Sequence, residues 1–328
     1  MGNDLKDNIK NNEEILVSII CITYNHEKFI KYALEGFLMQ KTNFKYEILI
    51  HDDASTDNTA EILKEYEKKY PKLIKVIYQK ENQYSKGKPV SSNLYKIAQG
   101  KYFAFCEGDD YWIDKNKLQK QVEFLENNKE YYATYHNVSI VDEKGNSCEE
   151  GRDIFSIKEE LDIYGIKENF SKLPGQLASI VSKNFYKYLL EKKIDIDSYK
   201  TNGDMKLPII FLSQGKIKFF KDMMSAYRRT YIGDSWNART KNKNLSEYHF
   251  RNAIELKRLV KDLVNEDIDI RQDLSIIWLI SLVEIKKNIT KENLKISFNI
   301  WKKSPNRLFM INYIIGRIIN KIKEWKKI

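Results

Sequence analysis

The chain has 328 residues, of which 42% are hydrophobic and 12% aromatic, so it can bury a large core and is not globally disordered. Its formal net charge is +10, and the basic excess is densest after residue 285. This asymmetry suggests either a surface held near anionic lipid or acidic polymer, or ordinary solvated lysines.

Three absences set the expected compartment. Cys21, Cys106 and Cys148 fall in no metal-ligand spacing, which argues against a zinc site or a disulfide scaffold and suits a reducing compartment. The segment 1–14 is polar and has no apolar stretch typical of a secretory signal. No run approaches the 18 apolar residues of a membrane span. We therefore expect a cytoplasmic protein, either soluble or peripheral at the inner face of the membrane.

The first 125 residues alternate between apolar runs and helical segments. Short β-branched or aromatic runs without polar alternation are typical of buried parallel strands, and here they lie at 15–23, 46–51, 74–79 and 102–106. Helices are predicted between them at 27–40, from Ser55 or Thr56 as cap to about residue 70, and at 91–99. This alternation predicts a doubly wound, mostly parallel α/β sheet.

Polar residues gather where the predicted strands end. The first strand ends in Thr-Tyr-Asn, the second in Asp-Asp-Ala-Ser-Thr-Asp, and the fourth in Glu-Gly-Asp-Asp. Open α/β sheets bind their ligands at this end of the strands. Three carboxylates there, at Glu107, Asp109 and Asp110, suit a hard cation, Mg²⁺ or Mn²⁺, that can also hold a diphosphate. The plainer alternative is that these acids only cap a helix starting near Asp114.

These strand ends together resemble a known family. VSIICITYN, EILIHDDASTDNT and GKYFAFCEGDD are similar to the N-terminal half of family 2 glycosyltransferases of the GT-A type. The resemblance implies a Rossmann-like, mostly parallel sheet flanked by helices, with a helical C-terminal region. It divides the chain into a polar segment 1–14, a glycosyltransferase domain 15–240 with a nucleotide-binding half 15–125 and an acceptor half 126–240, and helices at 241–328. The lack of G-x-G-x-x-G after the first strand argues against a dinucleotide-binding dehydrogenase.

The resemblance also assigns roles to individual residues. It implies metal binding by Asp109 and Asp110, in a D-x-D-like motif whose first acid is here Glu107. It implies nucleotide binding by the strand ends and by one arginine that would face the diphosphate, namely Thr23, Tyr24, Asn25, Asp52, Asp53, Glu107, Asp109 and Arg228.

The acceptor half carries fewer signals. Two strands are predicted around 132–141 with a turn at 143–146, and a further strand at 177–182 runs under the acceptor site in similar enzymes. His136 and Gln176 are the residues that we assign to acceptor binding, although a lone strand histidine is more often only a polar lining residue. The polar segment 147–172 is a candidate acceptor loop.

Asp204 is the candidate catalytic base. It precedes a predicted helix at 205–214, where the family places an acidic residue that takes the proton of the acceptor hydroxyl. The alternative is that Asp204 is only the N-cap of that helix. Asp195 and Asp197 are nearby competitors.

Four helices are predicted after residue 245, at 245–264, 273–287, 291–303 and 306–327. The last has one apolar face with lysines and arginine over the rest, and the face is formed by Ile314, Ile315, Ile318, Ile319, Ile322 and Trp325. Such a helix lies on an anionic membrane or packs on its neighbours, and the sequence leaves both open. The same region could pair two subunits.

The resemblance therefore predicts a metal-dependent inverting glycosyltransferase. Its donor would be a nucleotide sugar, by preference a UDP-sugar, and it would transfer the sugar to a hydroxyl of a glycan or lipid-linked acceptor in cell-surface polysaccharide synthesis. The alternative is an inactive nucleotide-sugar-binding or scaffold protein with the same fold. A nucleic-acid-binding protein ranks last, because charge alone suggests it and no nucleic-acid module is recognisable.

Overall fold

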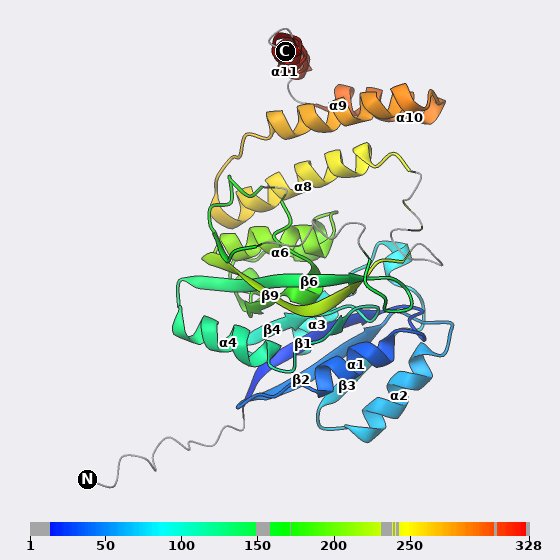
Figure 1. Cartoon of the computed structure of the whole chain (residues 1–328), viewed down its shortest axis with the longest axis vertical. Helices are drawn as coiled ribbons and strands as arrows, with labels where there is room; N and C mark the ends of the chain where they lie inside the picture. Colours follow the sequence, from blue (N-terminus) through cyan, green and yellow to red (C-terminus); the bar gives the residue numbers. More distant parts are fainter. Residues whose placement is uncertain are drawn as a thin grey trace, which may run out of the picture. The chain divides into compact units, whose positions relative to one another are not determined.

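The computed structural model describes residues 14–148, 158–170, 172–230, 238, 240, 243–304 and 307–325, with side chains as far as residue 316. It forms two compact units, drawn in sequence colours in Figure 1. The first contains residues 1–198 and 210–229, and the second contains residues 199–209 and 230–328. Most of the segment 1–14, part of the predicted acceptor loop 147–172, and residues 306, 326 and 327 of the predicted last helix lie outside the described residues.

The first unit is built on a mixed sheet, which has nine strands within the described residues. The order is β3-β2-β1-β4-β8-β6-β9-β5, with β7 paired to β9. The strands are β1 (Ile15–Thr23), β2 (Lys45–Asp52), β3 (Ile74–Tyr78), β4 (Tyr102–Phe105), β5 (Tyr111–Trp112), β6 (Tyr131–Val141), β7 (Leu161–Ile163), β8 (Val181–Lys183) and β9 (Lys216–Arg228).

The first four strands are parallel to one another, as the alternating pattern predicts. Helices flank the sheet, and the interior positions of β1, β2 and β4 are buried because both faces of the sheet are covered. The helices of this unit are α1 (Ile30–Leu38), α2 (Thr59–Lys69), α3 (Ser92–Ile97), α4 (Lys117–Asn127) and α5 (Tyr186–Glu191), with single turns η1 (Tyr84–Lys86), η2 (Leu177–Ser179) and η3 (Ile196–Ser198).

Antiparallel strands extend the sheet beyond β4. The short strand β8 pairs antiparallel with both β4 and β6, and β6 then runs parallel to β9 over almost its whole length. The prediction of two strands around 132–141 was wrong, because this stretch is the single strand β6, followed by a turn and one isolated bridge between Val141 and Ser147. The strand β9 pairs with β6 in place of the second hairpin strand that the sequence predicted.

A second local prediction also failed. Ser55 or Thr56 was expected to cap the helix after β2, but α2 begins at Thr59 and its N-cap residue Asn58 makes no side-chain capping bond. The Ser55 hydroxyl donates to the carboxylate of Asp52 instead. The polar residues before α2 are therefore used to join the strand ends.

The second unit is helical. It contains the start of α6 (Gly203–Leu212) together with α8 (Ser246–Val264), α9 (Arg271–Lys287), α10 (Lys291–Lys303) and α11 (Arg307–Trp325). The segment 199–209 belongs to it because Tyr199 donates its hydroxyl to Asp262 of α8 at 2.6 Å and lies under the guanidinium of Arg258 at 4.4 Å. Among the described helices, none combines the length and apolarity needed to cross a membrane.

Candidate active site

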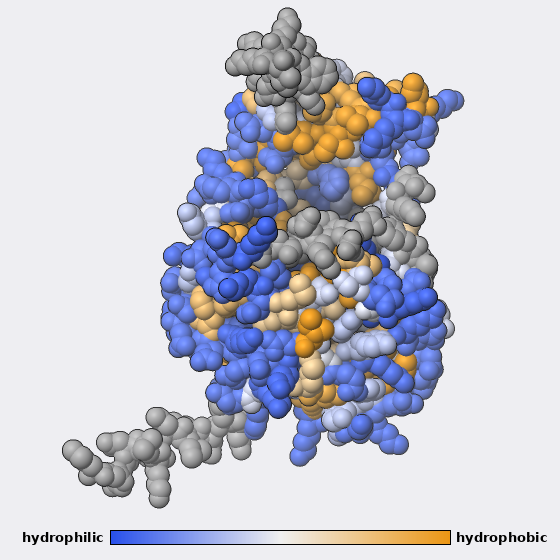
Figure 2. Space-filling model, viewed as in Figure 1, coloured by the Kyte–Doolittle hydropathy of each residue, from blue (hydrophilic) through white to orange (hydrophobic). Residues whose placement is uncertain are grey.

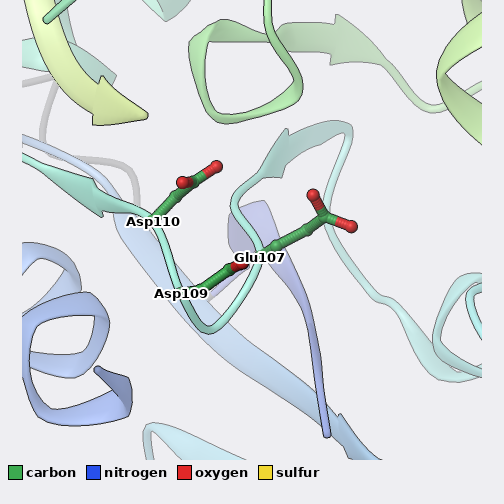
Figure 3. Close-up of side chains that lie close together, drawn as sticks. All are labelled: Glu107, Asp109 and Asp110. Atoms are coloured by element: carbon green, nitrogen blue, oxygen red, sulfur yellow. The ribbon is translucent and has the colours of Figure 1, made fainter. Parts of the chain in front are cut away.

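Three carboxylates meet in the loop that joins β4 to β5. Figure 3 shows that Glu107, Asp109 and Asp110 all project from this loop, and a carboxylate oxygen of each lies within 4.8 Å of the others. Asp110 is buried, whereas the other two are half-buried. An all-oxygen donor set of this size fits a hard divalent cation such as Mg²⁺ or Mn²⁺.

Asp110 is the most constrained of the three. Its carboxylate accepts a hydrogen bond from Gln176 Nε2 at 2.6 Å and another from the backbone N–H of Arg228 at 2.8 Å. Burial, together with the negative charges of Asp109 and Glu107, raises the pKa of Asp110 well above its usual range. Two hydrogen bonds therefore orient a carboxylate whose negative charge needs a nearby cation.

Arg228 is buried beside this loop and supports its backbone. Its Nε donates to the carbonyl of Asp109 at 3.0 Å, and its Nη1 donates to the carbonyls of Asp142 at 2.8 Å and Glu143 at 3.0 Å. The guanidinium also lies 4.6 Å from the ring centre of Phe29. These contacts show that Arg228 supports the backbone of the carboxylate loop. Its assignment to the diphosphate stays a prediction.

The loop packs directly on the end of β1. Gly108 donates its N–H to the carbonyl of Ile22 at 2.9 Å, and a Cβ on this glycine would lie 2.6 Å from Thr23 Oγ1. Thr23 is buried, and its hydroxyl has no hydrogen-bond partner among the described residues. The hydroxyl of Thr23, a residue that the resemblance assigned to nucleotide binding, therefore lies against the carboxylate loop.

His26 was not assigned a role by the sequence analysis. Its Nε2 lies 3.9 Å from a carboxylate oxygen of Asp109, and its Nδ1 is buried without a hydrogen-bond partner among the described residues. It directly follows the Thr-Tyr-Asn end of β1. This position is the only signal in the sequence that could have suggested it.

Asn25 joins the ends of β1 and β2. It adopts a left-handed backbone conformation with φ of 56°, its N–H donates to Ser55 Oγ at 2.9 Å, and its side-chain oxygen accepts from the N–H of Thr56 at 2.8 Å. Asparagine tolerates this conformation better than most residues. Tyr24, which precedes it, is half-buried.

Asp52 and Asp53 are both buried at the end of β2, and both make contacts within the protein. Asp53 accepts hydrogen bonds from the backbone N–H groups of Gln83 at 2.7 Å and Tyr84 at 3.0 Å. Asp52 accepts from Ser55, and burial raises the pKa of Asp52. The carboxylate of Asp53 therefore fixes the loop after β3 beside the strand ends.

The two predicted acceptor residues have different surroundings. Gln176 links the acceptor half to the carboxylate cluster, because it donates to Asp110 while its Oε1 accepts from the N–H of Ala178 at 2.6 Å. His136 is fully buried in β6, where its Nδ1 donates to the carbonyl of Asn137 at 2.8 Å. Burial and the charge of Lys117 lower the pKa of His136 well below its usual range.

Asp204 is the second residue of α6 and belongs to the second unit, whereas the carboxylate cluster belongs to the first. It is half-buried, its Oδ1 accepts from the N–H of Met205 at 2.8 Å, and burial raises its pKa. Of its competitors, Asp195 is exposed and accepts from the N–H of Asp197 at 3.1 Å in a local turn.

Comparison with protein families gives one match, to the model for glycosyl transferase family 2, over residues 18–184. The matched range covers the strand ends, the carboxylate loop and Gln176, and it ends before Asp204.

Two curated relatives each match somewhat over a third of the chain. An uncharacterized protein of Mycobacterium tuberculosis is 42% identical over 132 residues, which are 39% of this chain and 37% of that protein. The Escherichia coli protein WfaP, named UDP-Glc:alpha-D-GlcNAc-diphosphoundecaprenol beta-1,3-glucosyltransferase, is 38% identical over 126 residues, which are 38% of this chain and 47% of WfaP. The chain therefore matches less than half the length of each.

Among solved structures, the chain is similar to S. aureus TarS in complex with UDP-GlcNAc. The TM-score is 0.60 at 19% sequence identity, covering 88% of this chain and 80% of that chain. At this identity the likeness concerns the fold, a mixed and mostly parallel sheet flanked by helices with a helical C-terminal region.

Proposed function

We propose, because the chain belongs to glycosyl transferase family 2, that it transfers a sugar from a nucleotide-sugar donor to a hydroxyl of a glycan or lipid-linked acceptor, with inversion at the anomeric carbon. A UDP-sugar is the donor that we favour, since WfaP is named for UDP-Glc and the TarS structure contains UDP-GlcNAc. The cluster of Glu107, Asp109 and Asp110 is the observation that carries the proposal. We place the reaction in the synthesis of a cell-surface polysaccharide.

Asp109 and Asp110 are the proposed ligands of a divalent cation, Mn²⁺ or Mg²⁺, with Glu107 beside them. When bound there, the cation supplies positive charge to the diphosphate leaving group. Gln176 and the backbone of Arg228 hold Asp110 in place, and His26 lies beside Asp109. The geometry of the first unit thus supports a donor-diphosphate site at the ends of β1 and β4.

Asp204 is the proposed general base. The acceptor oxygen attacks the anomeric carbon, its proton passes to the Asp204 carboxylate, and the bond to the diphosphate breaks with its electron pair leaving on the nucleoside diphosphate. A base works best when its pKa lies near the operating pH, and burial moves the pKa of Asp204 upward in that direction. Its place at the start of α6 also supports the assignment.

Donor binding is tested by thermal shift with a panel of nucleoside diphosphates and nucleotide sugars, each with Mn²⁺, with Mg²⁺ and with EDTA. A ligand that binds the folded state raises the apparent melting temperature by mass action. We expect metal-dependent stabilisation by UDP or a UDP-sugar, and its loss in Asp109→Asn. Glu61→Gln, an exposed acid on α2, is the matched control. Absence of stabilisation by every nucleotide would favour the inactive scaffold protein.

The base is tested separately, by turnover of the donor identified in that screen. Asp204→Asn should lower turnover by about 10²- to 10⁴-fold while donor binding stays unchanged. Asp197→Asn, a neighbouring acid outside α6, should retain activity. Near-full activity of Asp204→Asn would contradict the base assignment but leave the donor site standing.

A further inference from the structure

The C-terminal helices expose apolar side chains although each already buries an inner face. Leu274 of α9, Ile300 of α10 and Met310 of α11 are buried within the second unit. Other apolar side chains of the same helices are exposed, among them Ile280 at 47%, Phe298 at 57% and Leu308 at 70%. Figure 2 shows hydrophobic atoms gathered over α9 and α10.

The exposed apolar residues follow helical spacing, so each helix presents a stripe. On α9 they stand four and three residues apart, on α10 four apart, and on α11 three and four apart. We call them the apolar stripes, and they consist of Ile276, Ile280 and Val283 on α9, Leu294 and Phe298 on α10, and Leu308, Ile311 and Ile315 on α11. A helix with both an inner apolar face and an outer apolar stripe therefore exposes a second apolar surface, and contiguous exposed apolar surface is typical of an interaction site.

The C-terminal segment that contains these helices carries nearly all of the net charge of the protein. Residues 271–328 contain 13 lysines and arginines against 4 acids, which gives +9 out of the total of +10. Lys286, Lys295 and Lys302 are exposed, and none of them forms an ion pair with an acid within the described part of the chain. A strongly basic surface beside apolar stripes is complementary to a layer that is apolar inside and anionic at its surface.

A second copy of this chain could also cover the apolar stripes. Its own segment 271–328 would, however, place a second net charge of +9 beside that of the first copy. Like charges facing each other oppose that association. Zwitterionic lipid would cover the stripes without using the lysines. Of these three occupants, an anionic lipid surface is the one that matches both features.

We propose that α9, α10 and α11 form a docking surface for an anionic phospholipid bilayer. The apolar stripes insert at the level of the head groups, and the exposed lysines contact lipid phosphates. This goes beyond the proposed reaction, because nothing in the argument uses the donor site. The sequence predicted such contact through the last helix alone. In the structure Ile314 of that helix is buried and Ile315 is exposed, while the side chains of Ile318, Ile319, Ile322 and Trp325 lie outside the described residues.

The test is cosedimentation of the full chain with vesicles of phosphatidylcholine alone and with about 30% phosphatidylglycerol, at low and high salt. We expect binding to the anionic vesicles, strongly weakened by salt, and little binding to phosphatidylcholine. The triple variant Lys286→Glu/Lys295→Glu/Lys302→Glu should weaken binding by about fivefold or more for each lysine. Ile280→Ser/Phe298→Ser should weaken binding while leaving the salt dependence in place.

The matched control reverses three exposed lysines of the first unit, Lys68→Glu/Lys69→Glu/Lys72→Glu, and should bind as the unmodified protein does. Equal binding to both vesicle types, equal loss in the control, or unchanged binding in the α9–α10 variants would overturn the proposal. So would concentration-dependent dimers in sedimentation velocity that the Ile280→Ser/Phe298→Ser variant abolishes. Thermal shift with the nucleotide, measured without vesicles, keeps this outcome separate from that of the proposed reaction.

Discussion

At the scale of single residues, Asp110 combines burial with two neighbouring negative charges. In the absence of a cation this arrangement destabilises the fold, because the charged form loses its hydration and meets like charges. Asp110→Asn removes the charge and keeps one oxygen that can accept from the backbone of Arg228, but it loses the hydrogen bond from Gln176 Nε2, which then faces an NH2 group. We expect the removal of the buried charge to outweigh this loss. We expect the variant to melt at the same or a higher temperature than the unmodified protein in EDTA, and to lose the stabilisation by Mn²⁺ with UDP.

The control for this prediction is Glu61→Gln, which removes an exposed carboxylate of α2 outside the carboxylate cluster. It should change neither the melting temperature in EDTA nor the response to metal. If Asp110→Asn lowered the melting temperature in EDTA and kept the metal response, Asp110 would be a structural acid and the proposed metal ligand set would need another member.

Lys117 is a second buried charge, outside the carboxylate cluster. Its Nζ lies 4.3 Å from the ring centre of Trp112 and has no hydrogen-bond partner among the described residues. Burial lowers the pKa of Lys117 from 10.5 to about 7, while Cys106 and Asp114 oppose the shift. Burial and, to a smaller extent, the charge of Lys117 lower the pKa of His136 in the same region.

The sign of the resulting pH dependence follows from proton binding. Between about pH 7 and 10.5 the unfolded chain keeps the lysine proton that the folded protein releases, so stability contributed through this group rises with pH. Below about pH 7 both states are protonated, and the folded state carries the full cost of burying the ammonium group. Lys117→Met should therefore be the more stable protein at pH 6, and its advantage should shrink toward pH 9.

Urea denaturation of both proteins across that pH range measures the effect, with the exposed Lys64→Met as control. A constant difference between the Lys117→Met variant and the unmodified protein would show that Lys117 stays charged in the folded state. The contact between the ammonium group and the Trp112 ring would then stabilise the charged form by more than burial destabilises it.

At the scale of elements, the close approach of the β4–β5 loop to β1 depends on Gly108. A Cβ at this position would lie 2.6 Å from Thr23 Oγ1 and 2.8 Å from Thr23 Cβ, below any normal contact distance. Gly108→Ala must therefore displace the carboxylate loop from the end of β1. We expect at least a tenfold loss of affinity for the metal–nucleotide pair, since an order of magnitude corresponds to only about 1.4 kcal/mol.

Gly316→Ala is the matched control, because a Cβ there meets nothing within 4 Å. In the interior of α11 alanine should stabilise the helix by roughly 0.5–1 kcal/mol and leave nucleotide binding unchanged. Isothermal titration with Mn²⁺ and UDP compares the two variants. Normal affinity in Gly108→Ala would mean that the loop can move without disturbing the site.

The success of the element predictions depended on how much of each signal is local. The strands β1 and β2 were predicted nearly to the residue, because strands buried on both faces form uninterrupted apolar runs. The stretch 131–141 was divided wrongly, because its partner β9 lies about 85 residues further along the chain, so no local pattern in the sequence indicates the pairing. The role of Ser55 failed for the same reason, since its contacts to Asp52 and Asn25 join two strand ends.

The site shows the same division. The acids of the carboxylate loop were identifiable as a motif, and their proximity is the consequence of one short loop. Three other contacts depend on tertiary packing. Arg228 supports the loop backbone, Asp53 binds the backbone at Gln83, and His26 lies beside Asp109. The spacing of residues along the sequence does not indicate such contacts. The sequence therefore identified most of the site residues but not several of the residues that they contact.

At the scale of the whole molecule, the chain divides into two compact units, and we expect a ligand that binds only one of them to stabilise that unit. The proposed donor site lies in the first unit, whereas the buried residues of α8, α9 and α10 lie in the second. Differential scanning calorimetry should therefore show two transitions. Mn²⁺ with UDP at about 100 times the dissociation constant should add about 2.7 kcal/mol to the first unit alone and raise its transition by about 5–10 °C.

Hydrogen exchange at a temperature between the two transitions assigns them, by comparing peptides of β1 and β4 with peptides of α8 and α10. Protection by the ligand should appear in the strands and be absent from the helices. Asp110→Asn supplies the control, because it should abolish the ligand-induced shift while both transitions remain. A single transition that moves as one with ligand would contradict the prediction, since it would mean that the sheet and the C-terminal helices unfold cooperatively.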